Sequence, residues 1–148
     1  MVSESTLLIN GVITIAINAI SVVGQHLLNK RSRKRQFTES WCRELRSTCR
    51  QLKRNAIQVD PTIVIEEDNL EDHTSPDVQE LVDVLEQATE LYDEMPDSLE
   101  NEDLDEALSE LVSWYHVPSY EGVRFTGAEV TENIVDLSID VLDAIENR

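Results

Sequence analysis

The side chains able to carry catalysis form no known catalytic set in this 148-residue chain. Its four glycines make no phosphate-binding loop, no Gly-x-Ser-x-Gly turn presents a nucleophilic serine, and no His-Glu-x-x-His sequence offers a zinc site. Di-iron helical bundles use Glu-x-x-His on two helices, and this sequence contains no such motif. We therefore expect a protein that is not an enzyme and that holds no metal or cofactor.

Two cysteines, Cys42 and Cys49, are the only thiols. On one predicted helix they lie about 10 Å apart along the axis, which is too far for a disulfide between them. No second Cys or His pair has zinc-binding spacing. We expect both cysteines to behave as small buried hydrophobic residues.

Residues 60–74 combine clustered carboxylates with a histidine, which raises the possibility of a metal site. The residues concerned are Glu66, Glu67, Asp68, Glu71, Asp72 and His73. Their spacing matches no calcium loop, because a central glycine and alternating oxygen ligands are missing, so a solvated acidic linker is the favoured interpretation. We expect the short apolar run Thr62–Ile65 to tuck against the other helices rather than join a sheet, since no second convincing strand is present.

Aromatic side chains and a cation gather before the last predicted helix. This candidate partner patch consists of Trp114, Tyr115, His116, Tyr120 and Arg124. Such residues often form the centre of a protein-binding surface. They can equally close the end of a helical core, and we favour that second interpretation.

The longest apolar run, Leu7–Leu28, must position everything that follows it. As a helix it would be about 33 Å long, against a bilayer core of about 30 Å. It is followed by five cations, Lys30, Arg31, Arg33, Lys34 and Arg35. A signal peptide has the opposite charge order, so residues 7–29 are predicted to be a transmembrane anchor, with a buried core helix as the alternative. The positive-inside rule places residues 1–6 outside the cell and the C-terminal domain in the cytoplasm.

The predicted anchor has polar residues at helical spacing on one face. They are Asn10, Thr14, Asn18, Ser21 and Gln25. Amide and hydroxyl side chains in hydrocarbon favour hydrogen-bonding partners on other helices. The face therefore suggests a homo-oligomer or a second membrane protein, unless these side chains bond to their own backbone or lie at the interface.

Residues 30–59 are predicted to form a basic juxtamembrane helix that is part of a bundle. Apolar residues from Phe37 through Trp41 and Leu45 to Ala56 recur on one side. The opposite side is basic and comprises Arg43, Arg46, Arg50, Lys53 and Arg54. A solvated bundle face is the favoured interpretation, contact with lipid headgroups is the second, and nucleic acid is the least favoured because no reader motif accompanies the charges.

Three further helices are predicted in the acidic remainder, residues 75–148. One begins with Ser75 as cap and Pro76 in its first turn and ends before Pro96, and another runs after Asp97 and Ser98 to about His116. Thr126 and Glu129 make a capping box for the last helix. Each helix has one apolar face, so the fold class is all-α: a single N-terminal transmembrane helix followed by a cytoplasmic four-helix bundle.

Charge is strongly segregated along the chain. Residues 30–54 hold ten of the twelve Lys and Arg, whereas residues 55–148 hold two Arg against 27 Asp and Glu. Such acidity argues against nucleic acid as a partner and is typical of proteins from salt-accumulating archaea, although acidic domains of other origin share it.

Together these patterns predict a membrane-anchored interaction protein, acting as an adaptor, scaffold or regulator, whose partners are membrane lipid and a protein. The alternative is a subunit of a small transmembrane oligomer, channel-like or membrane-perturbing, assembled through the polar face of the anchor. An enzyme of unfamiliar type is a third and weaker hypothesis.

Overall fold

The computed structural model describes the backbone of residues 4–67, 69–99, 101–115 and 124–147, and the side chains among these from residue 21 onward. The chain divides into two compact units, residues 1–37 and 38–148. Its elements are α1 (Glu4–Gln58), β1 (Val64–Ile65), the short 3-10 helix η1 (Leu70–Asp72), α2 (Pro76–Asp93), α3 (Glu102–Ser113), β2 (Phe125–Thr126) and α4 (Gly127–Glu146). The predicted anchor and the predicted basic helix both belong to the single helix α1.

The first unit consists of α1 as far as Phe37. From Ser21 to Phe37 its residues are exposed, apart from the half-buried Gly24. Among them, Val22 and Leu28 are both 65% exposed. Over the described side chains, no helix has a stretch long and apolar enough to cross a membrane, and residues 7–20 of the predicted anchor lie outside that range.

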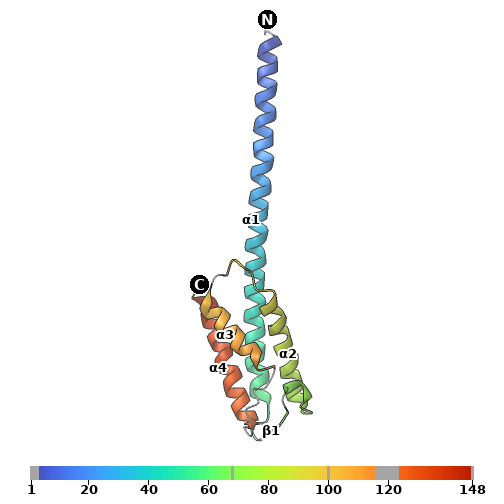
Figure 1. Ribbon diagram of the computed structural model, residues 1–148, viewed down its shortest axis with the longest axis vertical. Helices are drawn as coiled ribbons and strands as arrows, with labels where there is room; N and C mark the ends of the chain where they lie inside the picture. Colours follow the sequence, from blue (N-terminus) through green and yellow to red (C-terminus); the bar gives the residue numbers. More distant parts are fainter. Residues whose placement is uncertain (1–3, 68, 100, 116–123, 148) are drawn as a thin grey trace. The chain divides into compact units, whose positions relative to one another are not determined.

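The second unit is a bundle of four packed helices, as the sequence predicts. Figure 1 shows α2, α3 and α4 lying along the C-terminal part of α1. Each helix contributes one apolar face to a shared core. Fully buried side chains include Leu45 and Leu52 from α1, Leu81 and Leu85 from α2, Leu104 and Leu108 from α3, and Ile134 and Ile145 from α4. Phe37, expected on the apolar face, is 54% exposed, so the buried face of α1 begins at Trp41.

Hydrogen bonds from side chains to helix backbones join these helices. The indole N–H of Trp41 donates to the carbonyl of Leu91 at 2.8 Å and links α1 to α2. The Thr131 hydroxyl donates to the carbonyl of Ala56 at 2.7 Å, near the end of α1. Ala56 lies in the last turn of α1, where carbonyls lack an i+4 partner within the helix. Its carbonyl also accepts from the Val59 amide at 3.2 Å, and the bond from α4 adds a second partner at that end.

The predicted starts of α2 and α4 are confirmed, and that of α3 is shifted. Ser75 occupies the N-cap position of α2 without a side-chain capping bond, and Pro76 follows it. At α4 the Thr126 hydroxyl accepts from the Glu129 amide at 3.3 Å. The third helix, expected to begin after Ser98, begins at Glu102. Its cap is Asn101, whose side-chain oxygen accepts from the Leu104 amide at 3.2 Å, since a helix start needs an acceptor for its unpaired N–H groups.

A two-stranded antiparallel sheet links the connector after α1 to the start of α4. Val64 pairs with Thr126, and Ile65 pairs with Phe125. The expectation that residues 62–65 stay out of a sheet is therefore wrong. The missing partner strand is only two residues long and leads directly into a helix, so it gives no alternating pattern.

Gly127 lies where α4 meets this connector. Its amide donates to the carbonyl of Ile63 at 2.8 Å, and the Ala128 amide donates to the carbonyl of Pro61 at 3.2 Å. Two of the N–H groups left unpaired at a helix start are thereby satisfied. A Cβ atom at position 127 would lie 2.0 Å from the carbonyl oxygen of Asp60, so only glycine permits this approach.

Candidate functional site

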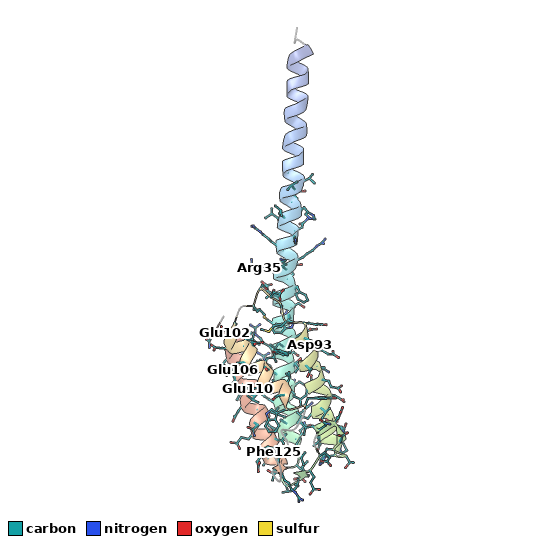
Figure 2. All side chains as sticks on the ribbon, in the orientation of Figure 1. Arg35, Asp93, Glu102, Glu106, Glu110 and Phe125 are labelled. Atoms are coloured by element: carbon teal, nitrogen blue, oxygen red, sulfur yellow. The ribbon has the colours of Figure 1, made fainter. Side chains whose placement is uncertain are left out.

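The five cations after the apolar run all have exposed side chains. They lie on α1 within the first unit, and Figure 2 labels the last of them, Arg35. Apolar side chains flank them along the helix: Leu27 and Leu28 before, Phe37 after, each more than half exposed. Exposed apolar and cationic groups thus follow one another along this part of α1.

The predicted polar face of the anchor is described only in part. Ser21 and Gln25, one helical turn apart, are exposed on α1. The side chains of Asn10, Thr14 and Asn18 lie outside the described range. Ser21 and Gln25 are thus available to a neighbouring helix or to headgroups.

The basic face of the bundle segment of α1 is directed outward. Arg43, Arg50 and Arg54 are exposed, and Arg46 and Lys53 are half-buried. The opposite side of the same segment, including Trp41 and Leu45, is buried in the core. Because the apolar side is already occupied, this segment cannot lie flat on a membrane with that side in the lipid while the bundle stays folded.

Three members of the candidate partner patch are described, and they have separate roles. Trp114 is 8% exposed and packs edge to face on Phe125, with ring centroids 5.4 Å apart. Arg124 forms an ion pair with Glu66 at 3.0 Å. Trp114 therefore covers the end of the core, and His116 and Tyr120 lie outside the described residues.

Tyr115, the third described member, bonds to carboxylates of two other elements. Its hydroxyl lies 2.5 Å from Oε2 of Glu71 in η1 and 3.1 Å from Oε1 of Glu86 in α2, and it donates to these carboxylates. The bond to Glu71, with partial burial and the bond to Glu86, raises the pKa of the Tyr115 phenol above its ordinary value. This side chain thus ties α3 to its neighbours, as a structural group does.

Both cysteines are buried and form no disulfide, as the sequence predicts for small core residues. Burial raises the pKa of the Cys49 thiol to about 12, because the thiolate loses solvation in the core. A nucleophilic role needs an accessible thiolate, so the folded bundle gives Cys49 none.

Side chains of the acidic connector, residues 60–74, form hydrogen bonds with residues close to them in the sequence. The Asp60 carboxylate accepts from the hydroxyl and the amide of Thr62, and these bonds hold the pKa of Asp60 below its ordinary value. Nδ1 of His73 accepts from the Ser75 amide at 3.1 Å just before α2. Leu70 in η1 is fully buried. Among the described residues, which omit Asp68, no three His, Cys, Asp or Glu side chains are placed to hold a metal ion.

A carboxylate-lined groove between α3 and α4 is the feature that the sequence reasoning missed. It encloses about 370 Å³, and its acidic lining is Asp103, Glu106, Glu110, Asp140 and Asp143. Figure 2 shows Glu102, Glu106 and Glu110 following one another along α3. Their spacing of four residues could have indicated a common helix face. Ala107 and Ala144 also line the groove.

No protein-family model, curated protein or solved structure matches this chain.

Proposed function

We propose that the protein is a membrane-anchored, non-enzymatic interaction protein, an adaptor, scaffold or regulator. In this proposal residues 7–29 span the membrane once, the N-terminus is outside, and the helical bundle is cytoplasmic. The observation that carries the proposal is the succession of an uncharged apolar run and an exposed group of cations on α1.

The direction in which charge changes along α1 favours a spanning helix over a helix lying on the membrane. A surface-lying helix separates apolar and charged residues around its circumference. Here Leu27 and Leu28 precede the cations along the axis, and no cation or carboxylate occurs from Leu7 to Leu28. Separation along the axis matches a helix that passes from hydrocarbon into headgroups.

The bundle supports the interaction half of the proposal. Its core is closed by four helices, so it needs no lipid to cover an apolar face. Its surface is dominated by carboxylates, with 27 Asp and Glu against two Arg in residues 55–148. This charge disfavours nucleic acid and favours a protein partner that presents cations, especially beside the groove between α3 and α4.

The topology is tested by thiol labelling of intact cells with a membrane-impermeant reagent. The native Cys42 and Cys49 are buried, so background labelling of these thiols should be low. A new cysteine must therefore be placed at an exposed position. Ser40 is exposed on α1, and we expect Ser40→Cys to react only after the membrane is opened. Ser3→Cys should react in intact cells, because the cationic flank keeps the other side in the cytoplasm.

Wild-type protein is the control, and it should label slowly even in opened cells until a denaturant exposes its two thiols. Labelling of Ser40→Cys before Ser3→Cys would reverse the proposed orientation. Recovery of the whole chain in the soluble fraction after gentle lysis would contradict the anchor itself.

A subunit of a small transmembrane oligomer is the alternative function. The observation favouring it is that Ser21 and Gln25 are exposed one turn apart, in line with the sequence positions of Asn10, Thr14 and Asn18. Hydrogen bonds between membrane helices contribute about 0.6–2 kcal/mol each.

Crosslinking in native membranes separates the two functions. With a photocrosslinking residue in place of Glu106, the interaction proposal predicts a discrete product with another protein. The alternative predicts a homo-oligomer that weakens by about 0.6–2 kcal/mol per contact in Asn18→Leu. Thr14→Val is the matched control, since a hydroxyl can bond to its own helix and matters less. A homo-oligomer that also passes ions in liposomes would replace the leading proposal.

A further inference from the structure

We propose that Lys30, Arg31, Arg33, Lys34 and Arg35, here called the basic collar, bind the phosphate headgroups of anionic phospholipids. This inference rests on the proposed anchor and specifies the class of lipid that surrounds its cytoplasmic end. The lipid would have a net negative charge, as phosphatidylglycerol does.

The collar lies at the depth where headgroups occur. At 1.5 Å per residue, its members lie about 3–10 Å beyond Leu28, the last apolar residue of the run. The headgroup layer on each side of a bilayer is about 5–8 Å thick. All five side chains are exposed, and long Lys and Arg side chains can extend toward the phosphates from slightly different heights.

The collar covers several sides of the helix rather than one face. Residues three or four apart are neighbours on a helix surface, so Lys30 lies beside Arg33 and Lys34, and Arg31 lies beside Arg35. At 3.6 residues per turn these five positions span roughly 200° of the helix circumference, more than one flat surface covers. A layer of lipid headgroups surrounds the helix and can contact all of them.

Apolar side chains on both sides of the collar favour lipid over nucleic acid. Leu27 is 53% exposed and Leu28 is 65% exposed immediately before it, and Phe37 is 54% exposed just after it. Nucleic acid bound to the cations would leave the two leucines in water. In a bilayer the leucines enter hydrocarbon, and three guanidinium groups offer paired donors to lipid phosphates.

The test measures lipid selectivity of the full-length chain in phosphatidylcholine vesicles by electron spin resonance. Trace spin-labelled phosphatidylglycerol or spin-labelled phosphatidylcholine reports the population of lipid in contact with the protein. We expect phosphatidylglycerol to be favoured by roughly threefold to tenfold at low salt, because each cation near the surface attracts anionic lipid. The preference should approach unity near 1 M salt, where charges are screened beyond about 3 Å. Both leaflets have the same composition, so protein orientation does not affect the readout.

Two variants with the same change in charge localise the effect. Replacing the whole collar by glutamine (Lys30→Gln, Arg31→Gln, Arg33→Gln, Lys34→Gln and Arg35→Gln) should abolish the preference. The matched control removes five cations from the bundle segment of α1 and should retain it: Arg43→Gln, Arg46→Gln, Arg50→Gln, Lys53→Gln and Arg54→Gln.

Each other outcome overturns a defined part of the argument. Equal contact of both lipids with the wild-type chain would overturn the collar inference and leave the anchor intact. Absence of any protein-contacting lipid population would overturn the anchor, and the collar inference with it. Equal loss in the two variants would assign the effect to total charge. Displacement of phosphatidylglycerol by a trace of duplex RNA would assign the collar to nucleic acid.

Discussion

Replacement of Gly127 by alanine should destabilise the helical bundle by about 3–5 kcal/mol, although it adds only one methyl group. A Cβ at this position would lie 2.0 Å from the carbonyl oxygen of Asp60 and 3.0 Å from a side-chain carbon of Ile63. The obstacle at Asp60 is backbone, so relief requires the connector to move away from α4. That movement would lengthen the bonds from Gly127 to Ile63 and from Ala128 to Pro61, and it would separate the paired strands.

The measurement is urea unfolding of the fragment Ser32–Arg148, which contains the whole packed unit, followed by circular dichroism. Ala128→Gly is the matched control. It makes the reverse exchange at the neighbouring exposed position of α4 and should cost no more than about 1 kcal/mol. Equal unfolding free energies for wild type and Gly127→Ala would mean that the connector does not hold the start of α4 as described.

Added salt should stabilise the same fragment on the order of 5 kcal/mol between dilute buffer and about 1 M. Residues 55–148 carry 27 Asp and Glu against two Arg, and the basic face of α1 offsets this only in part. Folding brings these like charges closer than they are in the unfolded chain. At 0.01 M salt the screening length is about 30 Å, comparable to a domain, so the repulsion acts across the whole bundle.

Thermal unfolding in a potassium chloride series checks this prediction. Screening should saturate near 1 M, where the screening length is already about 3 Å. A gain that continues into multimolar salt would support the hypothesis of a salt-accumulating host, because it requires stronger apolar burial or ion hydration beyond screening. A melting temperature that is the same at every salt concentration would contradict both the repulsion argument and that hypothesis.

Carboxylates also illustrate how local and non-local information differ. Glu106 and Glu110 can be assigned to one face of α3 from their spacing alone. That this face lies beside Asp140 and Asp143 depends on how α3 packs on α4. The groove is therefore a property of the packed pair of helices, which explains why reading one helix at a time missed it.

By itself, the sequence determined the features that depend on residues close together along the chain: the apolar-to-basic boundary, two helix starts and the buried helix faces. The boundary between Leu28 and Lys30 is visible as a change of residue type. The starts of α2 at Ser75–Pro76 and of α4 at Thr126 follow from residues within one turn, because capping is a local interaction. The buried faces of the four helices follow from periodicity, which is why the four-helix bundle was predictable.

Only the tertiary structure decided the contacts between residues that are distant in the chain. Ile65 and Phe125 pair across sixty positions in strands of two residues each, too short to show alternation. The need for glycine at position 127 comes from the carbonyl of Asp60, a group with no counterpart in the local sequence. The sequence allowed Trp114 to belong either to a binding surface or to the core, and its contact with Phe125 shows that it belongs to the core. In each case the deciding partner is far away in sequence, and packing alone brings it near.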